Sequence, residues 1–460
     1  MQTAGLVRLT IATPHRRIDM ALPEHMAVAE LLPGLLARAG EGLADDGVPG
    51  GGWVLRRGDG TAFDLDRTLG SHRVRDGEIL HLTPRRADWP ELEYDDVVDA
   101  IATGSGQTGR AWGPRHTRLA GLSAGAAALL LGLVAVLRAG PPWPGAAVWA
   151  LGAAALLLIA GVALARAMRD AGAGAVLAAV ALPYAFAGGG LALAGGNPVT
   201  GLSAGQLVLA GAALLLAALV GYLGVTAAPA LFAGAAMAGL LTVLGGWLAT
   251  FDDVAGHRSA AVVAGALLAL SGAFAPLALR LGRVPMPVLP RSTADLVRDD
   301  PQPPLAHVHA AVARADGLLT GMLAGTSVVV TACQVVLIRA GGTASAVLVS
   351  VLALGFLLRA RLYPVLRQRI PLLITGMSGL GCLALGPLLA DGAGALLTAG
   401  PLLFAVAAGA IAAGILLSTR RANPYLGRFA EYFEILLMVA IVPVVCWVLD
   451  LYAAVRGLGG

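Results

Sequence analysis

The spacing of apolar and polar residues changes near residue 110 of the 460-residue chain. Before this point, apolar positions alternate with polar ones or recur every three to four residues, which is typical of half-buried strands and amphipathic helices. After it, apolar runs of about 20 residues follow one another, and each can cross about 30 Å of hydrocarbon as a helix. The pattern predicts a soluble domain over residues 1–88, an acidic-to-basic linker over 89–118 and a transmembrane bundle over 119–460.

The soluble domain is predicted to contain two strands, a helix and two further strands. Residues 7–11 and 18–22 alternate apolar and polar side chains, as strands with one buried face do. Residues 28–36 place valine and leucine on one face of an amphipathic helix. Further strands are expected to begin at Trp53 and Ile79. This order over about 80 residues resembles the ubiquitin-like β-grasp fold.

Two features indicate how this ubiquitin-like domain is used. The turn Asp76-Gly77 before the last strand is similar to the corresponding turn of ubiquitin-like proteins. The chain then continues through the acidic stretch Glu91–Asp99, and Gly459-Gly460 follows the last apolar run. An interaction module is therefore expected rather than a conjugated modifier. No basic-then-apolar signal opens the sequence, so we expect this domain to stay in the cytoplasm.

Eleven apolar runs follow the linker, each close to the length of a membrane-spanning helix. The fourth and fifth are the hardest to separate, because only Thr226 and Pro229 interrupt them. The expected spans are Leu119–Leu137, Ala146–Ala165, Ala171–Leu193, Gly205–Val225, Ala227–Ala249, Ala260–Leu279, Leu318–Ile338, Gly341–Leu358, Pro371–Ala390, Ala395–Ser418 and Phe433–Tyr452.

The distribution of arginine supports this number of spans. With eleven helices and a cytoplasmic N-terminus, 17 arginines from residue 110 onward lie on the inner side. Four lie outside: Arg138, Arg258, Arg339 and Arg456. Merging the fourth and fifth runs would move the later arginine-rich loops outside, against the positive-inside rule. The C-terminus is then extracytoplasmic, and residues 280–317 form the longest cytoplasmic loop.

Composition agrees with a membrane protein, because 57% of the residues are hydrophobic and 13% are charged. Residues 1–110 carry a net charge of −5 and residues 111–460 a net charge of +9. The excess of arginine therefore lies in membrane-proximal loops, and no nucleic-acid partner is expected. The three cysteines, Cys333, Cys382 and Cys446, all lie in apolar runs and are expected to pack as small hydrophobic residues.

The expected spans contain few of the polar or ionisable side chains that transport or catalysis requires. Their only charged side chains are Glu434 and Asp450, near the ends of the last span. Ion-coupled transporters usually need an ionisable group at membrane depth. A secondary transporter with a regulatory β-grasp domain remains the alternative, with Pro183 and Gly188–Gly190 as the candidate helix break. The sequence contains no Walker motif, nucleophile arrangement or metal-ligand cluster, so neither an enzyme nor a cofactor is expected.

Glycines recur at a spacing that permits close contact between membrane helices. Examples are Gly121-x3-Gly125, Gly201-x3-Gly205 and Gly317-x3-Gly321-x3-Gly325. They favour a tightly packed bundle.

Several motifs accompany this architecture. Arg359-x-Arg361-Leu362-Tyr363-Pro364 is followed by Arg367-Gln368-Arg369-Ile370-Pro371, and a later loop contains Asn423-Pro424-Tyr425-Leu426-Gly427-Arg428. The last span contains Val442-Pro443. Together with an N-terminal ubiquitin-like domain and eleven spans, these motifs resemble the EccD family, the polytopic membrane subunit of type VII (ESX) secretion systems.

The resemblance implies a non-enzymatic scaffold in the bacterial plasma membrane. Its expected partners are EccB, the ATPase EccC, EccE, a second EccD copy and membrane lipids, with secreted effector proteins involved indirectly. The ubiquitin-like domain would dock near the stalk of EccC, and the helices would form the wall of a cavity. Candidate contacts with partners or anionic lipid are Arg359, Arg361, Arg367, Arg369, Arg420, Arg421 and Arg428.

Overall fold

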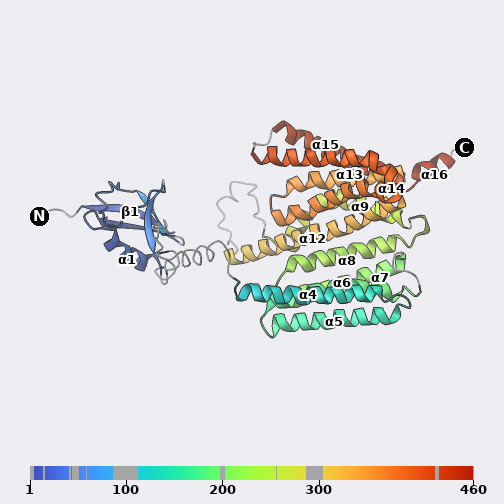
Figure 1. The fold of residues 1–460 in the computed structure, drawn as a ribbon, viewed down its shortest axis with the longest axis horizontal. Helices are drawn as coiled ribbons and strands as arrows, with labels where there is room; N and C mark the ends of the chain where they lie inside the picture. Colours follow the sequence, from blue (N-terminus) through green and yellow to red (C-terminus); the bar gives the residue numbers. More distant parts are fainter. Residues whose placement is uncertain are drawn as a thin grey trace, which may run out of the picture. The chain divides into compact units, whose positions relative to one another are not determined.

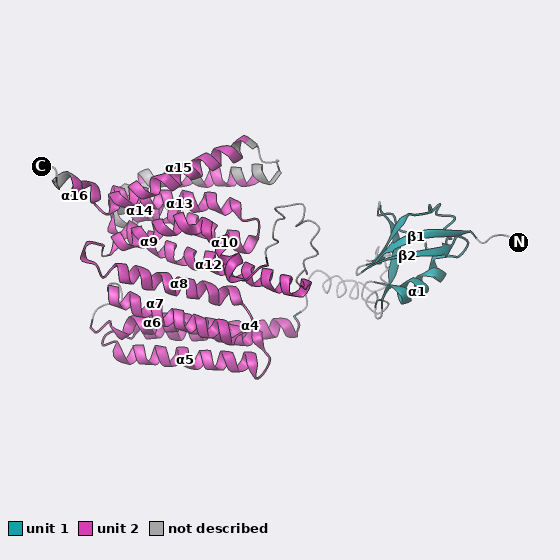
Figure 2. Ribbon diagram, turned by 180° about the vertical axis from the view of Figure 1, so that it is seen from behind, with its two compact units in different colours: residues 1–112 teal, residues 113–460 magenta. Residues whose placement is uncertain are grey.

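The chain divides into two compact units, residues 1–112 and residues 113–460 (Figure 2). Several of the positions singled out above lie outside the described residues: 91–99, Gly201, Arg420, Arg421, Asn423 and Gly459-Gly460. The computed structural model describes residues 5–13, 16–40, 43, 51–58, 60–85, 112–196, 202–254, 256–285, 304–419 and 424–458.

The first unit has the β-grasp topology that its sequence pattern predicts. Its described elements are β1 (Leu6–Ala12), β2 (Arg17–Pro23), α1 (Val28–Ala39), β3 (Trp53–Arg57) and β4 (Ile79–Pro84). The strands form one sheet in the order β2-β1-β4-β3. The central pair, β1 and β4, is parallel, and the two outer pairs are antiparallel.

Helix α1 packs on one face of this sheet. Alternate residues of β1, including Val7, Leu9 and Ile11, are buried against Leu31 and Leu35 of α1. The helix ends at Gly40, whose φ of 156° is a conformation that favours glycine. The amphipathic periodicity therefore predicted this helix and its end correctly.

The start of β4 is fixed by polar contacts. Gly77, with φ of 81°, donates its backbone N–H to Arg8, whose own N–H donates to Asp76. Burial raises the pKa of Glu78, but hydrogen bonds from the Arg75 backbone and the Arg57 side chain outweigh it, so the pKa lies below its ordinary value. The turn before the last strand is thus held by a network of charged and backbone groups.

The second unit is a bundle of long apolar helices (Figure 1). Among the described residues, ten helices or helix pairs are long and apolar enough to cross a membrane. The elements are α4 (Pro114–Arg138), α5 (Pro144–Arg166), α6 (Ala171–Ala192), α7 (Ala204–Gly224), α8 (Pro229–Leu248), η2 (Asp252–Val254), α9 (His257–Leu270), η3 (Ser271–Ala273), α10 (Phe274–Leu281), α12 (Leu305–Ala340), α13 (Thr343–Arg359), η4 (Ala360–Leu362), α14 (Leu366–Thr419), α15 (Pro424–Val448) and α16 (Leu451–Leu458).

The course of the chain along the bundle can be followed from contacts of the first part of α14. Its first residues include Arg367, which pairs with Asp316 in the first half of α12. Gly386, further along α14, lies against Ile338 at the other end of α12. The chain then has to run back, because Glu434 of α15 pairs with a residue near the starting end. The expected ninth and tenth spans both fall within α14, and ten stretches of the described residues qualify as membrane spans, so the count of eleven passages stays a prediction.

Two boundaries differ from the sequence prediction. Helix α12 begins at Leu305, so the last part of the expected 280–317 loop is helical; its Ala315 packs against Gly282. The expected sixth span is interrupted by the 3-10 turn η3 at Ser271. Pro276 follows in the first turn of α10, where it has no N–H for the carbonyl one turn earlier, which explains why a continuous α-helix is interrupted there.

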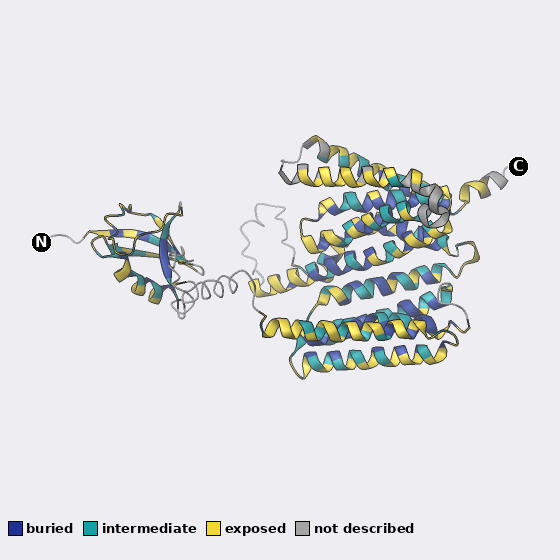
Figure 3. Ribbon diagram, in the orientation of Figure 1, coloured by how far each residue is buried: buried dark blue, intermediate teal, exposed yellow. Residues whose placement is uncertain are grey.

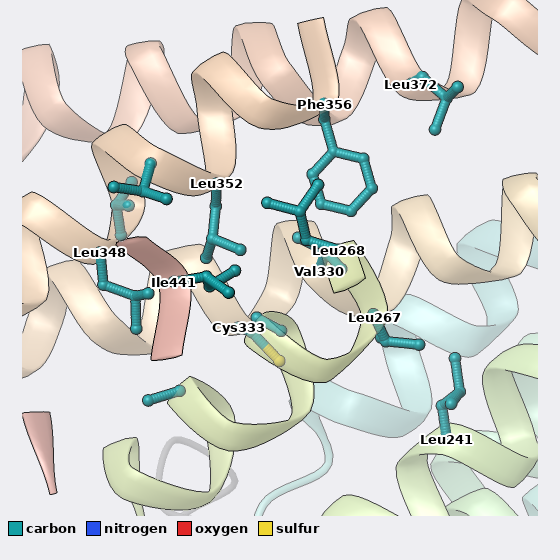
Figure 4. Close-up of a cluster of buried hydrophobic side chains, with 14 of the residues drawn as sticks. Leu241, Leu267, Leu268, Val330, Cys333, Leu348, Leu352, Phe356, Leu372 and Ile441 are labelled. Carbon is teal, nitrogen blue, oxygen red and sulfur yellow. The ribbon is translucent and has the colours of Figure 1, made fainter. Parts of the chain in front are cut away.

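The bundle core combines leucine side chains with closely packed glycines. Leu267 and Leu268 of α9 contact a cluster from α12, α13 and α15 that includes Phe356 (Figure 4). Between α8 and α12, a Cβ placed on Gly321 would lie 2.6 Å from the carbonyl oxygen of Ala230, so the two backbones touch. Gly121 and Gly125 have nothing within 4 Å of such a Cβ, although their spacing is the same.

The candidate helix break of the transporter alternative is a continuous helix. Pro183 and Gly188–Gly190 all lie inside α6. Gly188 packs against Leu151 of α5, and Gly189 packs against Leu209 of α7. These glycines serve helix packing, because each faces a neighbouring backbone or side chain.

The outer surface of the bundle is apolar. Helix α4 exposes most of its residues along its whole length (Figure 3). Leu119, Leu131 and Val134 on α4 are exposed, as are Ile435 and Val439 on α15. Exposed apolar surface of this extent is typical of helices that face lipid or another membrane helix.

Candidate functional site: the charged end of the bundle

Three of the seven candidate arginines, Arg359, Arg361 and Arg367, lie together at one end of the bundle, where α13 ends and α14 begins. We call this region the charged end, defined by Arg359, Arg361, Asp316, Arg367 and Glu434. Arg359, Arg361 and Arg367 lie where α13 ends and α14 begins, whereas Asp316 and Glu434 lie inside α12 and α15. The region therefore forms where the loop between α13 and α14 meets two neighbouring helices.

Arg359 and Glu434 form a largely buried ion pair. Nη1 of Arg359 donates to Oε1 of Glu434 at 2.7 Å, and the two side chains are 13% and 11% exposed. Nε of Arg359 also donates to Oγ of Ser271 at 2.9 Å. Arg361 lies 3.6 Å from the other carboxylate oxygen of Glu434. The four residues link α13, η3, η4 and α15.

A second cluster joins α12 to α14. Nε2 of Gln368 donates to Oδ1 of Asp316 at 2.7 Å, and Arg367 pairs with the other oxygen of the same carboxylate. Gln368 is buried, whereas the Arg367 side chain is 62% exposed. Both oxygens of Asp316 are therefore satisfied, and the carboxylate holds the start of α14 against α12.

Arginines at the same end also satisfy helix termini elsewhere in the bundle. Arg166, at the end of α5, donates to the carbonyl oxygens of Leu223 and Gly224 at the end of α7. Arg118 near the start of α4 pairs with Asp170 before α6. The last carbonyls of a helix have no partner within it and carry partial negative charge, so a guanidinium stabilises this end.

The opposite end of the bundle has its own link to the last helix. Nη2 of Arg258, at the start of α9, donates to Oδ2 of Asp450 at 2.7 Å. Asp450 lies two residues after Val448, the last residue of α15. Ion pairs thus hold α15 through Glu434 within the helix and through Asp450 just beyond its end.

The seven candidate arginines have different surroundings. Arg359, Arg361 and Arg367 contact carboxylates of this chain. Arg369 and Arg428 are exposed, and Arg420 and Arg421 lie outside the described residues. Contact of these arginines with a partner or with lipid stays a prediction.

Sequence reasoning did not identify the roles of Asp316, Ser271 and Gln368 in the contacts at and beside the charged end. Nothing in the sequence marks Ser271, and Gln368 stood only within a motif, since both roles depend on which helices become neighbours. Asp316 carried a sequence signal. It is an acidic residue next to a long apolar run, and several arginines follow later in the sequence. A carboxylate at such a boundary usually requires a cation.

The arrangement is suited to holding helices together. Every carboxylate at the charged end accepts from at least one guanidinium, so none is left as a free base. Among the described residues, no group of three or more histidine, cysteine or acidic side chains could hold a metal ion. What these contacts provide is a fixed arrangement of α9, α12, α13, α14 and α15.

Family models match both units of the chain. The model described as EccD-like transmembrane domain matches residues 117–458. The chain belongs to the EccD family. A second model, described as WXG100 protein secretion system (Wss), protein YukD, matches residues 6–82, the ubiquitin-like unit. EccD proteins are structural membrane components of type VII secretion systems, and this chain is accordingly a multi-pass membrane subunit of that class.

Individual proteins show similarity over nearly the full length. The ESX-4 secretion system protein eccD4 of Mycobacterium tuberculosis is 28% identical, and the alignment covers 99% of this chain and 98% of that protein. Protomer 1 of the ESX-3 core complex is similar with a TM-score of 0.61 and 22% identity, over 98% of this chain and 100% of the other. The MycP5-free ESX-5 inner membrane complex gives a TM-score of 0.55 and 19% identity, over 89% and 99% of the two chains. The last two likenesses concern the fold.

Proposed function

We propose that this chain is the scaffold subunit of a type VII secretion complex, docking the motor ATPase through its ubiquitin-like domain. The observation that carries the proposal is that both units match the same system: the bundle matches EccD and the first unit matches YukD. The related eccD4 protein aligns across both units as well. A scaffold that also contacts a soluble motor needs both a membrane bundle and a cytoplasmic adaptor.

The bundle geometry supports a structural role. Its ion pairs join helices that are distant in sequence, α13 to α15 and α12 to α14, and fix their relative positions. The interior of the bundle is filled by leucine and by glycine contacts such as Gly321 with α8. The transporter alternative gains no support, because its candidate break in α6 is a packed, continuous helix.

The proposed topology places the N-terminus in the cytoplasm and the C-terminus outside. With eleven passages, the start of α4 and the end of α15 lie at opposite ends of the bundle (Figure 1). The arginine-rich end would then face the cytoplasm, in keeping with the positive-inside rule. The exposed Arg369 and Arg428 would meet anionic lipid headgroups or partner subunits there.

The proposed partners are EccB, the ATPase EccC, EccE and a second EccD copy. The apolar surfaces of α4 and α15 support contacts with other membrane helices. Affinity purification of the tagged chain from its native membrane in mild detergent, with mass spectrometry and sizing, tests this composition. A large particle containing an ATPase and single-span subunits is expected. A lone monomer or homodimer, repeated in several gentle detergents, would refute the proposal.

A second experiment tests the role of the ubiquitin-like domain. Deletion of residues 1–100 leaves the described bundle intact and should abolish effector export while the truncated chain still inserts in the membrane. A matched control with the domain present and Arg73 changed to alanine should export normally, because Arg73 is an exposed loop residue. Undiminished export by the truncated chain would contradict docking through this domain.

A further inference from the structure

One surface of the ubiquitin-like unit has no role in the contacts described so far. Helix α1 covers one face of the sheet, and the other face carries the outward-pointing residues of all four strands. We call it the open face. Its outward strand positions are Leu6, Arg8, Thr10, Ala12, Arg17, Asp19, Ala21, Val54, Arg56, Ile79, His81 and Thr83, of which Val54 is buried.

Strand register places basic residues in a row across the open face. Ala12 of β1 pairs with Arg17 of β2 on one side and with His81 of β4 on the other. His81 in turn pairs with Arg56 of β3. Directly paired residues point to the same side of a sheet, and neighbouring strands are about 4.8 Å apart. The row therefore runs over all four strands and spans about 14 Å at the backbone.

The surroundings of this row increase its positive character. Arg8 lies on the same face of β1, and both Arg8 and Arg17 are exposed. Asp19 is the one carboxylate at an outward strand position of the described sheet, and it already accepts from Thr10 Oγ1 at 2.6 Å. In the turn before β4, Glu78 accepts from the Arg57 side chain and the Arg75 backbone N–H, and Asp76 accepts from the Arg8 backbone N–H. The open face is thus basic, although residues 1–110 are acidic overall.

We propose that the open face, through Arg17, His81 and Arg56, is the surface on which this domain binds an acidic segment of a partner protein. The inference rests on the proposed function, since it names the face used for docking. Guanidinium groups form paired hydrogen bonds with carboxylates, and arginine is enriched at protein interfaces. Exposed Leu6 and Ile79 on the same face add apolar contact area beside the charges.

The composition of the face favours a protein over a lipid surface. Segments that bind anionic membranes usually contain four to eight clustered lysines or arginines. Here, the outward strand positions hold three arginines and one histidine, interspersed with apolar and small residues. A flat row of alternating charge and apolar surface fits an extended or helical peptide with spaced carboxylates.

The absence of lysine from the sequence allows a direct test. In the full-length chain within its native complex, Arg17→Lys and Arg56→Lys would each retain the charge and introduce a single side-chain amine. A carbodiimide then joins that amine to any carboxylate in direct contact with it. Arg38→Lys, on exposed α1 and so on the covered side of the sheet, is the matched control. The unchanged chain, whose only amine is at its N-terminus, gives the blank.

The expected result is an amide bond from position 17 or 56 to a carboxylate of a different polypeptide, and none from position 38. Double charge reversal, Arg17→Glu with Arg56→Glu, should lower recovery of that polypeptide about tenfold relative to Arg38→Glu. Cross-links only to this chain's own residues 91–99 or to phosphatidylserine, or no cross-link in an intact complex, would overturn the proposal. If no complex co-purifies even with the unchanged chain, the proposed function itself fails.

Discussion

Replacement of Glu434 by glutamine should destabilise the bundle more than any other single change at its charged end. The substitution keeps the size of the side chain and removes the charge that compensates Arg359. That guanidinium is 13% exposed and has Ser271 as its other hydrogen-bond partner. A hydroxyl does not neutralise a cation, so the variant holds an unpaired charge in a poorly hydrated position.

The magnitude follows from burial of the pair. Removing one partner of a buried ion pair typically costs about 3–5 kcal/mol. The longer contact with Arg361, whose side chain is 33% exposed, adds at most about 1 kcal/mol. Glu431→Gln provides the matched control, because Glu431 lies on the same helix and is exposed. Its cost should stay within about 0.5 kcal/mol.

A double replacement separates lost pairing from lost packing. Arg359→Leu together with Glu434→Leu removes both charges and keeps apolar volume, so most of the stability should return. Free energies of unfolding can be measured in mixed micelles with increasing sodium dodecyl sulfate, using the intrinsic tryptophan fluorescence of the chain. The reasoning is refuted if Glu434→Gln matches the unchanged protein within about 0.5 kcal/mol, or if the double variant is as unstable as Glu434→Gln.

Three further outcomes are expected. Gly325→Leu should destabilise the bundle by about 1–3 kcal/mol or prevent its accumulation, because Gly325 packs directly on α8, whereas Gly125→Leu on open α4 should be tolerated in the same assay. The lowered pKa of Glu78 contributes stability that is complete above the ordinary value of 4.5 and is lost as the pH falls through the lower native value. The protection factors of the sheet amides, which are exchange rates corrected for the intrinsic rate at each pH, should therefore fall in acid, and less steeply in Glu78→Gln. Tyr184→Phe removes the 2.6 Å hydrogen bond to the Leu129 carbonyl and should cost about 1 kcal/mol in the micelle assay; no change would show that this bond does not hold α4.

Periodicity was a sound guide wherever a residue's role depends on its own element. The buried residues of β1 and α1, the end of α1 at Gly40 and the turn at Gly77 all follow from local pattern and backbone preference. The positive-inside rule likewise separated α7 from α8. These features need no knowledge of distant neighbours.

Long-range partners were beyond such reasoning. Arg359 and Glu434 are 75 positions apart, and their pairing depends on α13 and α15 becoming neighbours. Gly121-x3-Gly125 and Gly321-x3-Gly325 have identical spacing, yet only the second pair meets another helix in this chain. The glycine spacing indicates that two helices can approach closely, and the arrangement of the other helices determines whether they do.

The ion pair between α13 and α15 also affects the order in which the chain becomes stable. Ribosomes make Arg359 before Glu434, so a nascent or truncated chain holds this guanidinium without its carboxylate. Until α15 is in place, the charge either stays hydrated at the membrane surface or is buried without a partner, which costs free energy. Synthesis of α15 is thereby coupled to closure of the bundle around Arg359.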